Sequence, residues 1–210
     1  MHPQLQQIEN DMALTYALYP LSSLGKRRIK RCFDIVVSLL FACTLFPILF
    51  VVIGIIIKLN SKGPIIFKQE RNGKNGKVFK CYKFRSMETD SKQLIRFGHF
   101  MRRTHIDEFP QFVNVLKGDM SIVGPRPHMV EHTKEYTALI EEYTVRLLVK
   151  PGITGWAQIK GYVGDIHTLE DMKGRVKEDI WYIENWSFLL DLKIILRTTL
   201  DLFHKNRRKT

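Results

Sequence analysis

Two adjacent carboxylates close to two arginines form the densest group of chemically capable side chains in the sequence. They lie in the segment 102–111, which reads RRTHIDEFPQ. On a helix the side chains of Asp107 and Glu108 would point about 100° apart, so one could act as a nucleophile while the other binds a metal ion. Asp107 stands at an expected helix start, where the helix dipole favours anions. Arg102 and Arg103 could bind phosphate oxygens. A solvated helix cap would show the same pair of carboxylates, so the neighbouring motifs must decide.

Two later segments combine turn-forming residues with a side chain that could bind substrate. Segment 118–127 reads GDMSIVGPRP. Its Pro125 and Pro127 flank Arg126 and would hold the guanidinium on a stiff extended loop, where it could bind a diphosphate. Segment 150–158, KPGITGWAQ, is a turn-rich loop with one tryptophan. Simple turn chemistry plus one aromatic core residue also explains this second segment.

Metal and disulfide chemistry have weaker support. His128 and His132 have the i, i+4 spacing that zinc sites use. No third ligand stands at a persuasive spacing, so we interpret both as ordinary helix histidines. Cys32, Cys43 and Cys81 are few, odd in number and unpatterned, which excludes a disulfide scaffold and suits a reducing compartment.

Composition and charge exclude further classes of protein. An aromatic content of 11% together with long apolar runs excludes a disordered chain. The 33 basic and 21 acidic side chains give a net charge of +12, which favours a polyanionic partner: nucleic acid, anionic lipid or a phosphorylated substrate. The 210 residues show no internal repeat and divide into a polar tail over 1–25, a basic cluster with an apolar run over 26–60, and one globular domain over 61–210.

The apolar run indicates membrane insertion. Residues 35–57 carry no charge, and as a helix they would be about 34 Å long, enough to cross a hydrocarbon core of about 30 Å. The run starts too late and is too long for a secretory signal, and no small-residue cleavage site follows it. Basic residues flank both ends, so neither end has the composition of an external side. At the entry to the run, Asp34 is expected to pair with Lys30 and Arg31.

A proline near the middle of this run predicts a re-entrant helix. Pro47 cannot donate a hydrogen bond to the carbonyl of Cys43, and its ring clashes with that turn. The segments 35–46 and 48–57 would be about 18 and 15 Å long, each too short to cross alone. We therefore expect a helix broken at Pro47 that enters one leaflet and returns, with the Thr44 hydroxyl as partner of the freed carbonyl. A kinked but spanning helix is the alternative.

The rest of the chain predicts a mostly helical α+β fold. Segments 65–69 and 78–84 flank a turn at 73–76 and indicate a small β-hairpin. No alternation of strands and helices supports a Rossmann-type sheet. Four helices are expected, over 91–102, 107–117, 130–147 and 169–203. The last of them carries tryptophans and leucines and is followed by a basic tail, a pattern that fits a helix at a membrane interface and a core helix equally well.

The motifs of this chain, taken in order, resemble those of one family. They run from about Lys30 to Leu200 and are KRCFD (30–34) ahead of the proline-broken helix, SKGP (61–64), QERNG (69–73), KFRSM (83–87), DEFPQ (107–111), NVLKGDMS (114–121), GPRP (124–127) and PGITGW (151–156). They are similar to those of the bacterial sugar transferases, monotopic enzymes that make polyprenyl-diphosphate sugars. The part after Pro127 most resembles the undecaprenyl-phosphate glucose phosphotransferase branch. Larger members of that branch carry further N-terminal domains, so we expect a version that consists of the catalytic core.

The resemblance implies phosphoryl transfer in two steps. Asp107 would attack the sugar-bearing phosphate of a UDP-sugar and release UMP, and undecaprenyl phosphate would then take the sugar phosphate from the carboxylate. Glu108 would hold Mg²⁺. The residues expected to bind substrate are Arg102, Arg126, Lys83, Arg85 and Pro125. One position departs from the pattern, because His105 stands where such sequences usually have a small hydroxyl residue.

The resemblance also implies a location and a pathway. The catalytic domain is expected to face the cytoplasm from the bacterial inner membrane, to act in exopolysaccharide or related glycan synthesis, and by analogy could form a homodimer. Glucose is the expected sugar, ahead of galactose and N-acetylated sugars. A nucleic-acid partner is not expected, because the basic residues are dispersed and form no recognition module. A non-catalytic scaffold of polysaccharide assembly is the other alternative, and the intact pair Asp107-Glu108 argues against it.

Overall fold

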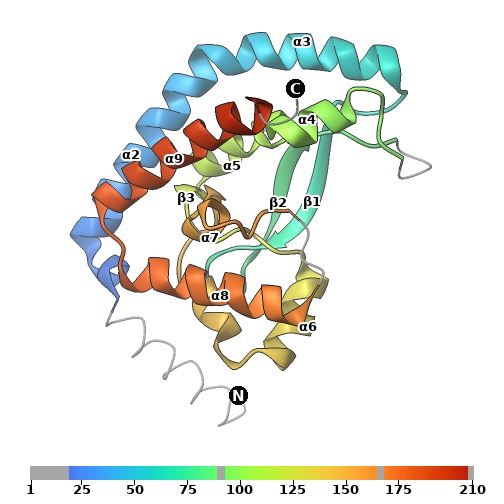
Figure 1. Ribbon diagram of the computed structural model, residues 1–210. Coiled ribbons are helices and arrows are strands. Elements are labelled where there is room, and N and C mark those ends of the chain that lie inside the picture. The colour runs from blue at the N-terminus through green and yellow to red at the C-terminus, as the bar shows by residue number, and fades with distance from the viewer. Residues whose placement is uncertain (1–18, 89–92, 165–167, 208–210) are drawn as a thin grey trace.

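The computed structural model of the chain describes residues 19–88, 93–164 and 168–207 (Figure 1). Its helices, with 3-10 segments written η, are η1 (Pro20–Ser22), α2 (Leu24–Cys43), α3 (Leu45–Asn60), η2 (Lys74–Gly76), α4 (Gly98–Thr104), η3 (Ile106–Glu108), α5 (Gln111–Lys117), α6 (Val130–Leu139), η4 (Glu141–Leu148), α7 (Trp156–Ile159), α8 (Leu169–Glu184) and α9 (Phe188–Arg207). Its strands are β1 (Ile66–Asn72), β2 (Val78–Phe84), β3 (Ser121–Val123) and β4 (Gly152–Thr154). The mostly helical α+β class expected from the sequence is confirmed.

The long apolar segment folds as two helices. α2 and α3 meet at Thr44 with a bend of 53° and form an arc along one side of the molecule (Figure 1). In the described parts of the chain, no helix by itself has the length and apolar character needed to cross a membrane, whereas the bent pair taken together does. The break lies three residues before Pro47. This proline has no N–H to offer the carbonyl of Cys43, so α2 ends at that carbonyl. The predicted break is confirmed, but it lies at Thr44 and not at Pro47 itself.

The hydrogen bond expected at the break is wrong. The Thr44 hydroxyl donates to the carbonyl of Leu40 at 2.7 Å, and not to that of Cys43. A threonine hydroxyl at the end of a helix reaches the carbonyl one turn back most easily, which explains this choice.

The part of the predicted tail that the structure describes packs on the domain. Residues 1–18 of the tail lie outside the described residues. Leu21 of η1 is buried in the main hydrophobic core, and Tyr19 packs against the same core. The next element, α2, begins at Leu24, so the basic cluster and the start of the apolar run belong to one helix.

The pairing predicted for Asp34 is also wrong. Asp34 forms no helix-surface pair with Lys30 or Arg31; its Oδ1 accepts hydrogen bonds from the Ser121 hydroxyl and the Ile122 N–H, both at 3.0 Å. This carboxylate is only 2% exposed, because its side of α2 packs on β3. Asp34 therefore anchors α2 to β3, the strand that leads into the loop of Arg126.

The two basic residues bind other helices. Lys30 donates to Asp191 Oδ2 on α9 at 2.6 Å and to the Tyr182 hydroxyl on α8 at 3.2 Å. Arg31 donates to carbonyls in the last turn of α5, including that of Leu116 at 2.8 Å, and so satisfies acceptors that a helix end leaves free. Each side chain thus joins α2 to an element distant in the sequence.

The predicted hairpin is confirmed. β1 pairs with β2 in antiparallel register, with Ile66 opposite Phe84, and η2 forms the turn between them. Side chains on the two faces of β2 pack in two different hydrophobic cores. Cys81 packs in the main core with residues of β3, α8 and α9, whereas Phe84 packs against Ile57 of α3. β2 therefore holds the broken helix pair on one side and the rest of the domain on the other.

A short parallel strand pair was not expected from the sequence. β3 and β4 are parallel neighbours, with α6 and η4 between them along the chain. Both are only three residues long and nearly fully buried, so neither shows the alternation of a half-exposed strand. A Cβ atom on Gly152 would lie 2.1 Å from the backbone nitrogen of Gly124, so only glycine permits this close approach.

The predicted helices differ from the observed ones mainly by interruptions. The helices expected over 91–102, 107–117, 130–147 and 169–203 correspond to α4, to η3 with α5, to α6 with η4, and to α8 with α9. Residues 91 and 92 lie outside the described residues. The start of the first predicted helix is wrong, because Leu94 forms a β-bridge with Met87 and α4 begins at Gly98. Ile140 has an extended conformation (φ −131°, ψ 111°) that ends α6. Ser187 Oγ accepts a hydrogen bond from the N–H of Leu190 (3.2 Å) at the start of α9. Apolar spacing continues across both interruptions, so periodicity alone did not show them.

α9 has one face in the core and one exposed face. It lies beside α2 (Figure 1), and its Asp191 and Ile194 are fully buried. Its exposed apolar side chains are Leu189, Leu192, Leu196 and Leu200. Trp186 is buried, whereas Trp181 is partly exposed and stacks on Trp156 with ring centroids 4.4 Å apart. The core-helix interpretation is therefore confirmed for one face, whereas a membrane interface at the exposed apolar face stays a prediction. The predicted basic tail lies beyond the described side chains.

Candidate active site

The adjacent carboxylates lie in a short 3-10 turn, and not on the first turn of a long helix as expected. η3 contains both Asp107 and Glu108, which are 6% and 5% exposed. His105 ends α4 in the left-handed conformation (φ 56°, ψ 14°), and its N–H donates to the carbonyl of Arg102. Histidine adopts this conformation more readily than most side chains. The reversal at His105 turns the chain from α4 into η3 and so directs the carboxylates into the protein.

Glu108 is bound by two cations. Its Oε1 accepts hydrogen bonds from Lys83 Nζ at 2.6 Å and from an Arg126 terminal nitrogen at 2.9 Å, and its Oε2 lies 3.3 Å from the other terminal nitrogen of Arg126. Burial by itself would raise the pKa of this carboxyl, but Arg126 and Lys83 hold the pKa well below its usual range. Glu108 is therefore an anion throughout the physiological pH range. The structure brings together Lys83 and Arg126, which the resemblance had named as substrate-binding residues.

The pKa of Asp107 is shifted in the opposite direction from that of Glu108. Burial first, and then the neighbouring Glu108 carboxylate, raise its pKa to about 6. Lys83, Arg102 and Arg126 act in the other direction but do not cancel this rise. The two carboxyl groups are thus distinct: Glu108 is a permanent anion, whereas Asp107 gains a proton just below neutral pH.

This difference predicts a pH dependence for any reaction that uses Asp107 as an ionised nucleophile. Because its pKa is raised, the carboxylate form is lost as the pH falls through about 6. We expect kcat/KM to be halved near pH 6 and to be about tenfold lower at pH 5 than at neutral pH. Initial rates measured from pH 5 to pH 8, after a check that the protein stays folded, test this. A rate that stays constant down to pH 5 would contradict it.

An asparagine outside the predicted site residues fixes the position of Lys83 relative to Glu108. Asn114 of α5 accepts a hydrogen bond from the N–H of Tyr82 (3.0 Å) and donates one to the carbonyl of Lys80 (2.8 Å). These bonds join β2 to the helix that follows the carboxylate turn. The spacing of the motif that contains Asn114 does not indicate this role.

Arg102 and Arg85 lie in different places. Arg102 lies near the carboxylate pair, and its Nε donates to the Ser86 hydroxyl at 3.0 Å. The Arg85 guanidinium is directed toward the loop after α3, where Nε donates to the Pro64 carbonyl at 2.7 Å and another nitrogen donates to the Ser61 hydroxyl at 2.8 Å. Arg85 therefore joins β2 to the end of α3, and a role for it in substrate binding stays a prediction.

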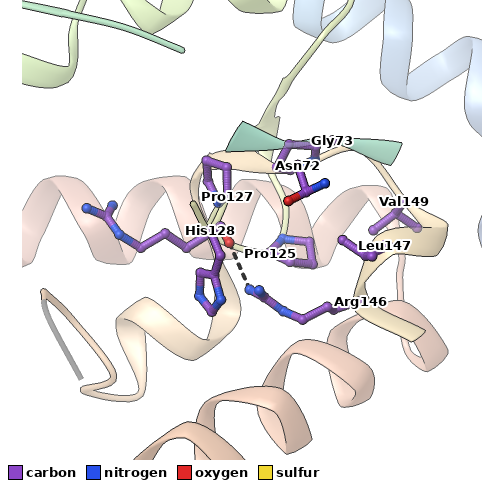
Figure 2. A pocket seen from close by; sticks show the side chains of 10 residues that line it. Asn72, Gly73, Pro125, Pro127, His128, Arg146, Leu147 and Val149 are labelled. Carbon is purple, nitrogen blue, oxygen red and sulfur yellow. Dashed lines mark hydrogen bonds between the residues drawn. The ribbon is translucent and has the colours of Figure 1, made fainter. Parts of the chain in front are cut away.

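The arginine loop between β3 and α6 is extended and is held against β4. The N–H of Gly124 donates to the Thr154 carbonyl, and the Pro125 carbonyl accepts from the N–H of Gly152, both at 2.9 Å. A narrow pocket beside the loop is lined by Asn72, Gly73, Pro125, Arg126, Pro127, His128, Arg146, Leu147, Val149 and Pro151 (Figure 2). The stiff presentation of Arg126 expected from its flanking prolines agrees with these bonds.

The carboxylate pair fits one kind of Mg²⁺ site. Mg²⁺ prefers hard oxygen ligands and often takes one or two protein carboxylates together with substrate phosphates and water. Glu108 supplies an ionised oxygen ligand of this type. Within the described ranges, no three or more Asp, Glu, His or Cys side chains are grouped so that they could hold a metal ion. A Mg²⁺ ion at Glu108 would therefore depend on oxygen ligands from the substrate.

The two histidines do not share a helix. His128 precedes α6 and is buried, with its Nδ1 2.6 Å from the Tyr143 hydroxyl. Burial and then the surrounding arginines, Arg146 first among them, lower its pKa well below the usual value. The description of both residues as helix histidines is therefore wrong for His128, whereas His132 lies on α6.

Known proteins resemble this chain over most of its length. A family model described as "Bacterial sugar transferase" matches residues 25–205. The chain is 43% identical to the UDP-glucose:undecaprenyl-phosphate glucose-1-phosphate transferase of Escherichia coli K12, in a match that covers 97% of this chain and 46% of that protein. It is 40% identical to a protein of the same name from Caulobacter vibrioides, over 87% of this chain and 73% of that protein. It is also 40% identical to the UDP-N-acetylgalactosamine-undecaprenyl-phosphate N-acetylgalactosaminephosphotransferase of Aeromonas hydrophila, over 81% of this chain and 42% of that protein.

The match includes all of the elements that build the carboxylate site. The chain spans less than half the length of the E. coli and A. hydrophila relatives. The family model nevertheless runs from the start of α2 almost to the end of α9, and so contains the broken helix pair, η3 and the arginine loop. From this coverage it follows that the chain belongs to the bacterial sugar transferase family.

Proposed function

We propose that this chain transfers a sugar-1-phosphate, glucose-1-phosphate first of all, from a UDP-sugar to undecaprenyl phosphate, with UMP as the other product. The observation that supports this most directly is the buried pair in which Lys83 and Arg126 neutralise Glu108 while the pKa of Asp107 is raised. The names of the E. coli and C. vibrioides relatives describe transfer of glucose-1-phosphate in connection with UDP-glucose and undecaprenyl phosphate.

The reaction would consist of two displacements at one phosphorus atom. In the first, a carboxylate oxygen of Asp107 attacks the sugar-bearing phosphorus and forms a P–O bond. The P–O bond of the diphosphate bridge breaks, and the bridging oxygen leaves with its electron pair on UMP. In the second, a phosphate oxygen of undecaprenyl phosphate attacks the same phosphorus and displaces the carboxylate. Asp107 returns to its starting state, and the sugar phosphate ends on the lipid.

The cations near Asp107 would lower the electrostatic barrier to the first displacement. A carboxylate must approach a diphosphate that is itself an anion, and the two repel. Lys83 and Arg126, whose side chains are each 20% exposed, place positive charge beside the buried carboxylates, where it acts more strongly than in water. Arg102 adds positive charge from an exposed position. When bound at Glu108, Mg²⁺ would supply further charge neutralisation of the diphosphate.

We place this site at the headgroup level of the bacterial inner membrane, with the domain on the cytoplasmic side. The uncharged stretch of α2 and α3 has many exposed apolar side chains, namely Val36, Leu39, Leu40, Leu45, Ile48, Val51, Val52 and Ile55. The exposed leucines of α9 extend this apolar surface, because α9 lies beside α2 (Figure 1). A helix pair that enters and leaves on one side keeps both basic flanks in contact with anionic headgroups. A soluble donor and a lipid acceptor can meet only at such a boundary.

The re-entrant arrangement predicts that both ends of the helix pair are accessible from one side. Gly25 in the first turn of α2 and Lys62 just after α3 are exposed, so each can be replaced by cysteine after the exposed Cys32 and Cys43 are changed to alanine. We expect a membrane-impermeant maleimide to label both introduced thiols in inside-out vesicles and neither in intact spheroplasts. Labelling of the two positions from opposite sides would show a spanning helix.

Release of UMP tests the proposed reaction itself. The protein in lipid nanodiscs with Mg²⁺ and UDP-glucose is expected to release UMP and to form an equal amount of lipid-linked product when undecaprenyl phosphate is present. Release of UDP in place of UMP would indicate transfer of the sugar without its phosphate. No release of either nucleotide would support the scaffold alternative.

The identity of the sugar is tested by the same assay with other donors. Glucose is favoured by the relatives from E. coli and C. vibrioides, and the A. hydrophila relative brings N-acetylgalactosamine into the comparison. Initial rates with UDP-glucose, UDP-galactose and UDP-N-acetylgalactosamine at equal concentration rank the three. A higher kcat/KM with either of the last two would replace glucose in the proposal.

A further inference from the structure

The loop that carries Arg126 is held through its backbone carbonyls. Four consecutive carbonyls each accept a hydrogen bond from a different residue. The pairs are Pro125 with the Gly152 N–H (2.9 Å), Arg126 with Arg146 (2.8 Å), Pro127 with Arg71 (3.0 Å) and His128 with the Asn72 N–H (3.1 Å). The donors come from β1, η4 and β4, so separate elements converge on one short loop.

The prolines explain why carbonyls matter at this loop. Pro125 and Pro127 have fixed φ angles but no N–H groups, so the loop cannot be held as an ordinary strand. The ψ angle of each residue stays free to rotate, and this angle sets the direction of the carbonyl and of the next peptide plane. A hydrogen bond to the carbonyl removes this freedom. The direction of the Arg126 side chain therefore depends on the groups that bind these carbonyls.

Arg146 is a rigid donor to the Arg126 carbonyl. It is 3% exposed, and its Nε and one terminal nitrogen lie 3.1 and 2.8 Å from Asp179 Oδ2. The same terminal nitrogen donates to the Arg126 carbonyl, as the dashed line in Figure 2 shows. The other terminal nitrogen lies 3.3 Å from the Tyr143 hydroxyl. Asp179 neutralises the buried guanidinium and fixes its plane, so the bond to the loop has a defined direction.

Arg71, which precedes the loop in the sequence, binds the next carbonyl, that of Pro127. It lies on β1, where one terminal nitrogen donates to the Pro127 carbonyl and the other to Gln69 Oε1. Arg71 and Arg146 thus bind the peptide units on the two sides of Pro127. Neither arginine was predicted from the sequence as a site residue, although Arg71 lies in the motif QERNG (69–73).

We infer that Arg146 and Arg71 are positioning residues, which act through the carbonyls of Arg126 and Pro127 to hold the Arg126 guanidinium at Glu108 and at the diphosphate. This inference rests on the proposed function. It distinguishes these two arginines from the residues that touch substrate. It also explains why the buried charge of Arg146 lies behind the loop.

The test replaces Arg146 with lysine, which keeps the charge but cannot bind Asp179 and the loop carbonyl with a planar fork. A misplacement of about 1 Å at a reacting group can cost about 10²-fold, so we expect kcat for UMP release to fall by about 10- to 100-fold. The matched control is Arg175→Lys. Arg175 is equally buried, but it donates to the carbonyls of Tyr162 and Gly164. It meets the loop only at a side chain, the Nε2 of His128 at 3.4 Å, and binds none of the four loop carbonyls. We expect Arg175→Lys to lose comparable thermal stability and to keep kcat close to that of the unaltered protein.

A double-substitution cycle decides whether Arg146 acts through Arg126. In an Arg126→Lys background the bidentate contact to Glu108 is already lost, so Arg146→Lys should lower kcat by less than about threefold further. Arg71→Lys should show the same non-additivity, and it serves as the second variant if Arg146→Lys does not fold. Equal effects of Arg146→Lys in both backgrounds, or an equal loss of kcat in Arg175→Lys, would show a merely structural role and overturn the inference. Failure of the unaltered protein to release UMP would reject the proposed function and this inference together.

Discussion

Replacing Asp107 with asparagine is expected to reduce UMP release by about 10³-fold or more. The amide keeps the shape of the side chain but has no anionic oxygen to attack phosphorus, and removal of a covalent nucleophile typically costs at least this much. Stability is not expected to fall, because the carboxylate of Asp107 is buried beside that of Glu108 and its removal relieves a repulsion. Asp171→Asn, on the exposed side of α8, is the matched control and should keep the full rate.

The covalent step provides a second measurement on the same variant. With Mg²⁺ and a UDP-sugar labelled in the sugar, but without undecaprenyl phosphate, the unaltered protein is expected to retain label after denaturation. The Asp107→Asn variant should retain none. Full turnover by this variant, or lipid product formed by the unaltered protein without any adduct under trapping conditions, would show that Asp107 is not the nucleophile.

Replacing Lys30 with methionine is expected to lower the free energy of unfolding by about 3 kcal/mol. Lys30 Nζ lies 2.6 Å from Asp191 Oδ2, and the two side chains are 10% and 1% exposed. Removal of one partner leaves a buried charge, which typically costs about 3–5 kcal/mol. The lower value applies because Tyr182 and Trp186 still donate to Asp191. For a chain of this size the melting temperature should fall by about 6–12 °C, measured by thermal unfolding in one detergent.

Two further variants separate this effect from a general loss of positive charge. Lys177→Met on α8 removes an exposed lysine and should change stability by less than about 0.5 kcal/mol. In the double variant Lys30→Met with Asp191→Asn no unpaired charge remains, so part of the lost stability should return. A double variant less stable than Lys30→Met alone would show that the charge of Asp191 is not the source of the effect.

The broken helix was largely predictable because its cause is local. Pro47 removes one hydrogen bond and clashes with the preceding turn, and these facts depend on a few neighbouring residues. The partners of Asp34 and Lys30 were not predictable in the same way. Their spacing on one helix suggested a local ion pair, but the structure offers each a buried partner far away in the sequence. A buried partner is chosen over an exposed one because an unpaired polar group is costly only where water is absent.

In the active site, too, features with a local cause were predictable and those that depend on distant partners were not. The pair Asp107-Glu108 and the arginine between two prolines stood out in the sequence because they are rare combinations of residue types in specific motifs. The role of Arg146 did not stand out. A single arginine in a polar segment has no distinctive spacing, and its effect on the site depends on Asp179 and on a carbonyl 20 residues earlier.

Residue types and their short-range spacing were enough to predict the family, the hairpin, the break in the apolar helix and the two carboxylates that are proposed to react. These follow from residue type and short spacing, which are properties of the chain in any conformation. The folded structure was needed to show that Glu108 is paired with Lys83 and Arg126 and that Asp107 has a raised pKa. The structure also shows that Arg85 binds the loop after α3 and that Arg146 lies behind the loop of Arg126. These features depend on burial and on contacts between distant segments, and both arise only when the chain packs.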